Sequence, residues 1–572
     1  MKRLMKYIRP EFTYIIITMA IKFITTYAEL WIPSLMETML DEKVPLGKAG
    51  PIYFYGGMML LVSVVCFGLN IMANRMTAFS SGRITKNIRH DLFQKLQSLS
   101  ARQMDELTVP SAESRLTSDT YNVNQVFTRI QRMGIRAPIL LIGGIFMMVQ
   151  MDLMLSLVLI GLLPFIVLII LFVTRRSLPL YSKQQKTLDR VVRVVQENIT
   201  GARVVKALSK TEHEKGRFSE VNQELSNISE RAGLLTSLTG PVTTIVLRIG
   251  LTLVVLFGAY RVNAGHIRPG VIMAALQYFI MIINATAGIT RIFVMTSRGQ
   301  ASANRIADVL ELPEDMQLKE VLEPEKQASH IEFRNVSFSY TGVGKNIDGL
   351  SFRLEHGQTL GILGGTGSGK TTILNLLMRL YDPDEGQILM DGQDIRSIPN
   401  EELRKKFGIV LQNDFVAEGT IAHNIRFFRD IPDENLEKAA ACAQASFIAE
   451  KEGGMDAEVV VRGNNLSGGQ KQRLLIARAL AANPEILVLD DASSALDYKT
   501  DSELRKALRE NYRQTTTVLV TQRVSSLQHA DLILVLHDGE VIGAGTHAEL
   551  LEACEEYRGI AETQMGDGKE AS

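Results

Sequence analysis

Long apolar runs in the first half of the chain constrain its fold more than any other feature. A helix that spans a bilayer needs about 20 mostly apolar residues. Six segments approach that length: 12–36, 52–74, 137–150, 153–174, 240–261 and 271–294. The third is short by itself but extends backward through 122–136. We therefore predict a membrane domain over residues 1–300, with both of its ends on the same side of the bilayer.

The positive charges between these segments indicate which side that is. The second-to-third and fourth-to-fifth connections are rich in Lys and Arg, whereas those on the other side are short and hold few cations, such as Lys43, Lys48 and Arg268. Connections rich in Lys and Arg stay in the cytoplasm. We expect a multi-pass protein of the cell membrane, in contact with its lipids, with both termini and both long connections cytoplasmic.

The two long connections have the composition of helices. Segments 81–104 and 181–209 have few helix breakers and carry apolar residues at helical spacing. We predict that the membrane helices continue into the cytoplasm and reverse near 105–114 and 209–216. The alternative is a basic region of cytoplasmic loops.

The overall charge and the cysteines exclude several classes of protein. The chain has 62 basic and 62 acidic residues and a formal net charge of zero, which does not favour a nucleic-acid partner. Three cysteines lie far apart without metal-ligand spacing, so no disulfide framework is expected. No cleavable signal peptide is evident.

A phosphate-binding loop dominates the second half. The P-loop pattern is complete in the run Gly364, Gly365, Thr366, Gly367, Ser368, Gly369, Lys370 and Thr371. An apolar strand precedes the run and a helix from Thr372 follows it. Glycines let backbone N–H groups converge on phosphate, and the helix N-terminus adds positive potential. Lys370 is expected to reach the outer phosphates of a nucleotide, and Thr371 its Mg²⁺ ion.

Further motifs follow the P-loop in a fixed order. Leu466–Gln470 reads LSGGQ, the strand 486–489 ends in Asp490 and Asp491, and Gln412 and Gln522 each come just after an apolar strand. This series resembles the nucleotide-binding domain of ATP-binding cassette (ABC) transporters. Six membrane segments fused to one such domain resemble an ABC exporter half-transporter, most similar to the multidrug-type exporters of bacteria.

The resemblance implies a function for each motif, with ATP and Mg²⁺ as cofactors. Tyr340 would stack on the adenine, and Thr371, Gln412 and Asp490 would contact the metal. Asp497 would communicate across the interface between two such domains. The residues Ser467, Gly468, Gly469 and Gln470 would act on the nucleotide held by the partner's domain.

Two positions depart from the pattern of the family. Asp491 stands where the family usually has Glu, and Gln522 where it usually has His. Aspartate is one methylene shorter, so its carboxylate lies about 1.5 Å further back. Glutamine cannot carry the charge of an imidazolium. We predict a degenerate site that binds ATP but hydrolyses it slowly, and a heterodimer partner with intact Glu and His. The alternative is a harmless variation in a working ATPase.

The resulting fold class is a membrane α-helical bundle fused to an α/β P-loop nucleotide-binding domain. We place a linker at 301–330, the ATP-binding domain at 331–565 and a tail at 566–572. The expected function is a subunit of an ATP-driven exporter of hydrophobic or amphipathic compounds, either drugs or lipids. The alternative is an ATP-gated channel, sensor or regulatory subunit. A peptide exporter with its own protease is disfavoured, because no such domain precedes the first segment.

Charged residues in the membrane segments suggest a polar interior. Lys22 and Glu29 share a helix face, and Arg248 and Arg291 lie in the fifth and sixth segments. Glu29 would either attract a cationic substrate or pair with a charge on a neighbouring helix, as buried charges need partners. Methionines such as Met273, Met281 and Met295 would line an adaptable cavity, pack between helices or contact lipid.

Overall fold

The chain forms two compact units in the computed structural model. The model describes residues 2–313, 315–319, 328–412 and 415–565. We call Met1–Ser98 with Val109–Leu312 the helical unit, and Leu99–Thr108 with Pro313–Ser572 the α/β unit. The predicted tail, 566–572, and part of the predicted linker, 320–327, lie outside the described residues.

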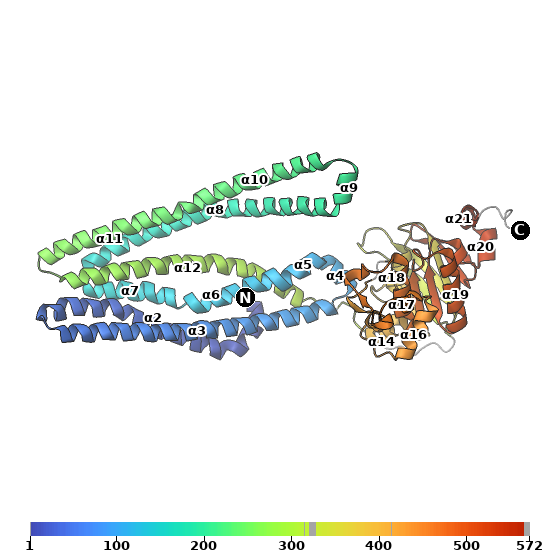
Figure 1. The fold of residues 1–572 in the computed structure, drawn as a ribbon, viewed down its shortest axis with the longest axis horizontal. Helices are drawn as coiled ribbons and strands as arrows, with labels where there is room; N and C mark the ends of the chain where they lie inside the picture. The colour runs from blue at the N-terminus through green and yellow to red at the C-terminus, as the bar shows by residue number, and fades with distance from the viewer. Residues whose placement is uncertain (1, 314, 320–327, 413–414, 566–572) are drawn as a thin grey trace. The chain divides into compact units, whose positions relative to one another are not determined.

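The helical unit consists of long helices (Figure 1). The main ones are α2 (Phe12–Thr38), α3 (Ala49–Ser98), α6 (Thr120–Met133), α7 (Arg136–Met151), α8 (Leu153–Thr200), α10 (Thr211–Ser237), α11 (Thr239–Asn263) and α12 (Pro269–Leu310). Shorter helices are α1 (Met5–Ile8), α5 (Val109–Ser114) and α9 (Ala202–Ala207). Since α12 continues to Leu310, the first ten residues of the predicted linker are helical.

Most of the predicted membrane segments lie in helices long and apolar enough to cross a bilayer. Five such stretches occur among the described residues: Met5–Leu46, Ala49–Ser98, Val109–Met151, Thr211–Asn263 and Pro269–Thr286. The predicted fourth segment, 153–174, begins α8, where Leu153–Ile169 is a shorter apolar stretch. Helices α3 and α8 both run far beyond their apolar parts, as the sequence predicts.

A break at Gly134 and Ile135 separates α6 from α7 inside the predicted third segment. A Cβ at residue 134 would lie 2.4 Å from the carbonyl oxygen of Ile130, so the backbone here leaves room only for glycine. Pro138, near the start of α7, has no N–H to continue a helix from upstream. The third segment is therefore two helices, which the sequence pattern did not predict.

The first reversal occurs earlier than the predicted 105–114. Helix α3 ends at Ser98, and Ser100 starts α4 (Ala101–Leu107) through a capping box with Gln103. Thr108, with a φ of 63°, ends α4. The second reversal, predicted at 209–216, also begins earlier, because α8 ends at Thr200 and α9 starts at Ala202.

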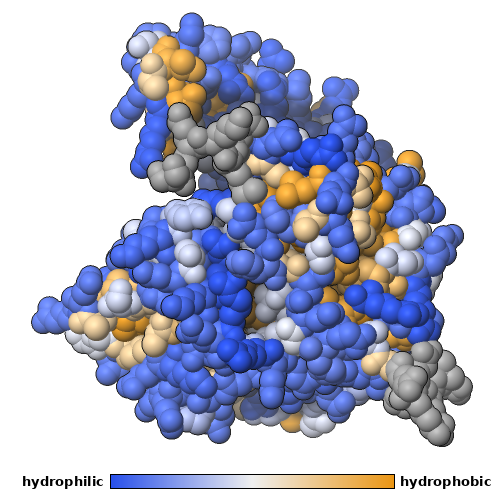
Figure 2. All heavy atoms as spheres, turned by 90° about the vertical axis from the view of Figure 1, so that its right-hand side faces the viewer, coloured by the Kyte–Doolittle hydropathy of each residue, from blue (hydrophilic) through white to orange (hydrophobic). Residues whose placement is uncertain are grey.

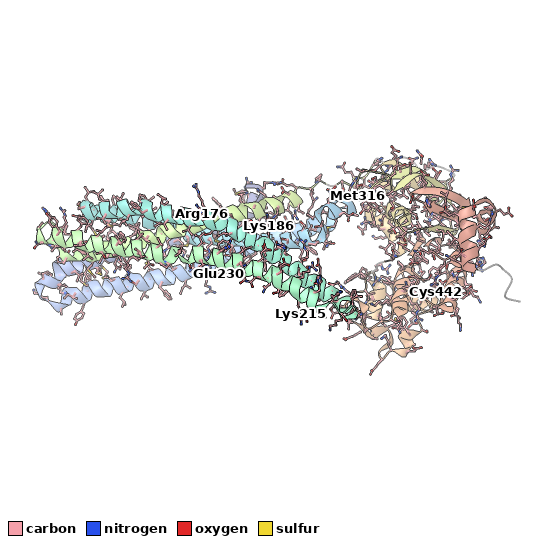
Figure 3. All side chains as sticks on the ribbon, turned by 90° about the horizontal axis from the view of Figure 1, so that it is seen from above. Arg176, Lys186, Lys215, Glu230, Met316 and Cys442 are labelled. Carbon is pink, nitrogen blue, oxygen red and sulfur yellow. The ribbon has the colours of Figure 1, made fainter. Side chains whose placement is uncertain are left out.

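Helices α8 and α10 form an antiparallel hairpin (Figures 1 and 3). Three side-chain contacts join them: Arg190 to Glu224 at 2.8 Å, Gln184 to Ser229 at 3.0 Å and Arg217 to Glu197 at 2.6 Å. Figure 3 marks Arg176 and Lys186 on α8, and Lys215 and Glu230 on α10. Polar contacts thus hold the hairpin together where its sequence is no longer apolar.

The α/β unit contains two main sheets. The six-stranded sheet has the order β12-β11-β3-β10-β9-β6. Its strands are β3 (Thr359–Gly364), β6 (Phe407–Val410), β9 (Ile486–Asp490), β10 (Thr516–Val520), β11 (Leu532–His537) and β12 (Glu540–Gly545). The antiparallel four-stranded sheet joins β2 (Ile347–Leu354), β1 (Ile331–Phe338), β4 (Glu385–Met390) and β5 (Gln393–Asp394).

Helices complete the α/β unit around these sheets. They include α13 (Lys370–Leu377), α15 (Ile421–Arg426), α16 (Asp433–Cys442), α17 (Phe447–Glu450), α18 (Gly468–Leu480), α19 (Tyr498–Asn511), α20 (His547–Ala553) and α21 (Glu555–Met565). One apolar core lies between the two sheets and α13, and a second is built from α15 to α18. The face of this unit drawn in Figure 2 is mostly hydrophilic.

Candidate functional site

The predicted nucleotide-binding residues meet because their strands run parallel. Strand β10 pairs in parallel with β3 and β9, and β6 pairs in parallel with β9. Val520 at the end of β10 lies opposite both Ile362 and Asp490. The carboxyl ends of parallel strands lie along one edge, where open α/β sheets bind ligands. The P-loop, Asp490 and Gln522 therefore gather at one edge of the sheet.

The P-loop joins β3 to α13 in a conformation that depends on glycine. Gly367 and Gly369 have φ angles of 84° and 101°, which favour glycine. A Cβ at Gly365 or Gly367 would meet no atom within 4 Å, so this side of the loop is open to a ligand. The loop ends at the first residue of α13, where free N–H groups favour an anion.

Lys370 lies folded over the P-loop backbone. Its Nζ donates to the carbonyl oxygens of Gly364 at 2.9 Å and Gly365 at 2.5 Å. Burial lowers the pKa of Lys370, while Asp490 and Asp491 act in the opposite direction. The ammonium group is thus at the open loop, beside the two carboxylates.

The residues predicted to hold Mg²⁺ fit a small, hard cation. The Oγ1 of Thr371 lies 3.5 Å from the Oδ2 of Asp490, and hydroxyl and carboxylate oxygens suit this ion. Burial raises the pKa of Asp490, and the neighbouring Asp491 raises it further. A cation bound here would stabilise the charged form of Asp490 and so oppose both effects on its pKa. Gln412 follows β6 and is exposed, and residues 413–414 lie outside the described chain.

Asp491 and Gln522 lie on the turns that follow β9 and β10. Asp491 has a φ of 49°, and its N–H donates to the carbonyl oxygen of Val520 at 2.9 Å. The carbonyl oxygen of Gln522 accepts from Nε2 of Gln564 at 2.7 Å, while Oε1 of Gln564 accepts from the N–H of Val524 at 2.8 Å. Gln564 belongs to α21 and holds the backbone on both sides of Arg523. No sequence pattern pointed to Gln564.

The LSGGQ residues form the start of α18. Ser467 caps the helix through a capping box with Gln470, which leaves Ser467 and Gly468 exposed. Two residues beyond Gln470, Nε2 of Gln472 donates to the Oγ of Ser494, and its Oε1 accepts from the N–H of Ala495, each at 2.9 Å. Among the described residues, no hydrogen bond joins Ser467–Gln470 to the P-loop. Helix α18, which begins with the LSGGQ residues, is thus hydrogen-bonded to the loop after Asp491.

Asp497 and Tyr340 occupy defined positions near these motifs. Asp497 caps α19 by accepting from the N–H and the hydroxyl of Thr500 at 2.9 and 2.8 Å, and these bonds lower its pKa. The half-buried ring of Tyr340 packs edge-on against Tyr381, with centroids 5.0 Å apart. Its hydroxyl accepts from Nδ2 of Asn375 on α13 at 2.9 Å.

The charged residues of the helical unit include Glu29, for which the sequence left two roles open. Glu29 on α2 pairs with Arg136 on α7 at 3.0 Å, so the predicted pairing with a neighbouring helix is confirmed. Lys22 is buried, and its Nζ donates to Oδ1 of Asn70 at 2.7 Å. Arg248 borders a separate cavity. The side chain of Arg291 lies outside the described residues.

Met281 packs against the buried core of the helical unit, whereas Met273 is exposed. Met295 is half-buried. The packing role is thus found at Met281, and Met273 lines a cavity with Asp41 and Arg268.

Comparisons with known proteins identify the family. The family model "ABC transporter transmembrane region" matches residues 14–286, and the model "ABC transporter" matches residues 347–494. An uncharacterized ABC transporter ATP-binding protein of Bacillus subtilis, YfiB, is 32% identical over 575 residues, covering 100% of each chain. The chain belongs to the ABC transporter family.

Other relatives of this ABC transporter agree in layout. An ATP-dependent lipid A-core flippase of Syntrophus aciditrophicus is 29% identical over 578 residues, covering 99% of this chain and 95% of the flippase. The solved structure of a bacterial Atm1-family ABC exporter with ATP bound has a TM-score of 0.80 and 24% identity, covering 98% of this chain and 99% of its own.

The fold class predicted for this ABC transporter is confirmed. A membrane helical domain precedes a P-loop ABC nucleotide-binding domain, with the fold of an Atm1-like exporter. This ABC transporter is a multi-pass membrane protein with bacterial homologues, and it is a half-transporter of a family whose half-transporters dimerise. Its family is that of ATP-driven transporters, which implies the use of ATP and Mg²⁺.

Proposed function

We propose that this half-transporter exports hydrophobic or amphipathic compounds, lipids or drugs, in a heterodimer whose two ATP sites differ. The observation that carries the proposal is the pair Asp491 and Gln522 at the edge of the sheet, beside Lys370 and Asp490. A lipid substrate is supported by the likeness to the lipid A-core flippase. We also propose the domain boundaries predicted from the sequence, with a membrane domain over 1–300, a linker over 301–330 and an ATP-binding domain over 331–565.

The proposal assigns nucleotide binding to the P-loop and its neighbours. Tyr340 stacks on the adenine, and Gly364–Thr372 surround the phosphates with N–H groups and the Lys370 ammonium. Thr371, Gln412 and Asp490 hold Mg²⁺, which neutralises phosphate charge when bound. Asp497 relays the state of the site across the dimer interface. The open side of the loop at Gly365 and Gly367 supports this assignment.

Hydrolysis at this site is slow because the side chain of Asp491 is too short and that of Gln522 carries no charge. The Asp491 carboxylate is too short to take the proton of an attacking water efficiently, and loss of a positioned base costs ~10²–10⁴ in rate. Gln522 donates a hydrogen bond but carries no charge. The intact residues Ser467–Gln470 at the N-terminus of α18, of which Ser467 and Gly468 are exposed, serve the partner's nucleotide.

Purification of the chain alone and with a candidate partner tests the proposal. The partner is a half-transporter with Glu and His at the positions equivalent to Asp491 and Gln522. We expect the isolated chain to bind ATP with slow turnover, and the pair to hydrolyse it ~10²-fold faster or more. A Lys370→Ala variant serves as the control that loses binding. Equal turnover with and without the partner would refute the heterodimer.

A regulatory subunit or ATP-gated channel is the second candidate, because the same two substitutions weaken hydrolysis without preventing closure around ATP. Transport into sealed inside-out vesicles distinguishes the two functions. An exporter accumulates substrate against its gradient only when ATP is supplied. A channel or switch allows only equilibration.

A further inference from the structure

A cavity of 390 Å³ in the helical unit is bordered by four cationic side chains. Lys22 comes from α2, Arg129 and Arg132 from α6, and Arg136 from the start of α7. Asn70 and Asn74 of α3 add amide groups, while Phe67, Ile71 and Met133 add apolar surface. The cavity therefore combines positive charge with an apolar wall, and its volume lies within the range of ligand sites.

Among the described residues, carboxylates compensate only part of the positive charge of this cavity. The Glu29 carboxylate pairs with Arg136 at 3.0 Å and accepts a hydrogen bond from Nδ2 of Asn70 at 3.3 Å. Among the described residues, no carboxylate lies within ion-pair distance of Lys22, Arg129 or Arg132. Glu29 thus pairs with one of the four cations, Arg136, and the other three lack a carboxylate partner among the described residues.

Two further observations show that these donors are incompletely used. Lys22 is only 3% exposed, and its Nζ makes one hydrogen bond, to Oδ1 of Asn70 at 2.7 Å. The Nε of Arg136 is buried and has no hydrogen-bond partner. A buried cation without an opposing charge is costly, and ionisable groups within membrane segments usually face a pathway or a watery cavity.

We propose that this cavity binds the anionic head group, a phosphate or a carboxylate, of the amphipathic compound that the transporter exports. The guanidinium groups of Arg129 and Arg132 hold the anion through paired N–H donors, and Lys22 adds a point charge. Phe67, Ile71 and Met133 contact the adjoining apolar part. This inference rests on the proposed export function, and it excludes a cationic substrate at Glu29.

The position of the cavity along the helices is consistent with loading from the cytoplasmic leaflet. Asn70 and Asn74 lie at the end of the apolar segment 52–74 that adjoins the first long basic connection. Lys22 lies ten residues, about 15 Å, beyond the start of the first segment. By the predicted orientation, the cavity lies in the inner half of the bilayer.

Lipid binding by the full chain in nanodiscs of neutral phosphatidylcholine tests the proposal. The probes are a fluorescent short-chain phosphatidic acid and the matched short-chain phosphatidylcholine. We expect the anionic probe to bind about tenfold more tightly or better, since hydrogen bonds to charged groups are strong. Equal affinity for the two probes would overturn the proposal.

Variants of the cavity supply the matched controls. Arg129→Gln with Arg132→Gln should reduce the preference for phosphatidic acid about tenfold, and Lys22→Met should reduce it similarly. Arg129→Lys with Arg132→Lys should retain only part of it, because lysine keeps the charge but lacks the paired N–H donors. Arg248→Gln, in a separate cavity, should leave it unchanged. A preference that survives the double Gln variant would refute the assignment.

Two further measurements distinguish a free anion from an amphipathic ligand, and a defect of the anion site from a folding defect. Displacement of the lipid probe by inorganic phosphate at similar affinity would identify a free anion as the ligand and overturn the amphipathic part of the proposal. ATP binding by each variant reports on folding, so a variant that loses only the anionic probe supports the site. If vesicle transport fails while the charge preference persists, the export function fails and the anion site stands.

Discussion

The two substituted residues of the ATP site differ in how the fold holds them. Asp491 is fixed by its own backbone, through a left-handed φ and a hydrogen bond to Val520. The backbone of Gln522 is fixed by a side chain of α21, while its own side chain is exposed. Since the turns at both positions are well supported, we attribute the expected loss of rate to side-chain chemistry rather than to a distorted site.

Substitutions at single residues should have unequal effects on the assembled dimer. Gly468→Asp should lower ATP hydrolysis by about 10²-fold or more, because a carboxylate at the start of α18 repels the partner's phosphate. The new Cβ itself would meet only Ala495 at 3.5 Å, so folding should survive. Asp491→Asn should lower it less than about threefold, since little catalysis depends on a misplaced base. Steady-state ATPase rates measure both, and equal losses would identify Asp491 as a working base.

A buried histidine makes the stability of the α/β unit depend on pH. Burial lowers the pKa of His330, against the opposing effect of Asp391, whose Oδ1 lies 2.9 Å from its Nδ1. The unfolded chain takes up the proton near pH 6.5, but the folded chain does so only at lower pH. The unfolded state therefore binds more protons in that window, and stability falls as pH is lowered through it.

Thermal unfolding of the full chain between pH 7.5 and 5 measures this effect. The unfolding temperature should fall with pH, and His330→Gln should flatten that slope. His356→Gln is the matched control, since it removes the exposed imidazole that also contacts Asp391 at 2.9 Å. An unchanged slope in His330→Gln would assign the pH dependence to other groups.

At the scale of elements, helix ends and loops are connected by a few side chains. The side chain of Gln472 on α18 is hydrogen-bonded to Ser494 and Ala495. The side chain of Arg523 donates to the carbonyl oxygen of Ser494 at 3.3 Å. Gln564 of α21 then holds the backbone around Arg523. Hydrogen bonds thus connect α18, the loop after Asp491 and the turn at Gln522 in sequence.

Gln564→Ala should loosen the turn at Gln522 without affecting nucleotide affinity. The substitution leaves the carbonyl of Gln522 and the N–H of Val524 without their partner. We expect ATP turnover of the dimer to change by roughly three- to tenfold and the Val524 amide to exchange hydrogen faster, as backbone protection is lost. Thr563→Ala, on the same exposed helix, is the control. Unaltered exchange at Val524 would show that Gln564 does not position the turn.

At the scale of the whole molecule, the orientation in the membrane is a prediction from the distribution of Lys and Arg. The short connection near Lys48 and the long connection near Lys210 are both exposed, and the sequence places them on opposite sides. The native thiols of Cys66, Cys442 and Cys554 are buried, which leaves a low labelling background.

Thiol labelling of intact cells with an impermeant maleimide tests this orientation. Lys48→Cys should react in intact cells, and Lys210→Cys only after the cells are opened, because the reagent does not cross the membrane. The unsubstituted chain provides the background. Reaction of Lys210→Cys in intact cells would reverse the predicted topology.

The sequence by itself determined the features that depend on local chemistry. Apolar runs of about 20 residues predicted the membrane helices, and the glycines and Lys370 of the P-loop predicted the phosphate-binding loop between a strand and a helix. These patterns are readable because helix periodicity, strand burial and turn formation are set by residues close together in the chain.

The tertiary structure alone decided which distant residues meet. Gln564 lies about forty residues from the turn it holds, and Glu29 is more than a hundred residues from Arg136. The cationic cavity draws its side chains from four helices. The physical reason is that such contacts depend on packing, in which helices with similar sequence patterns can pair in many ways and only the assembled core selects one.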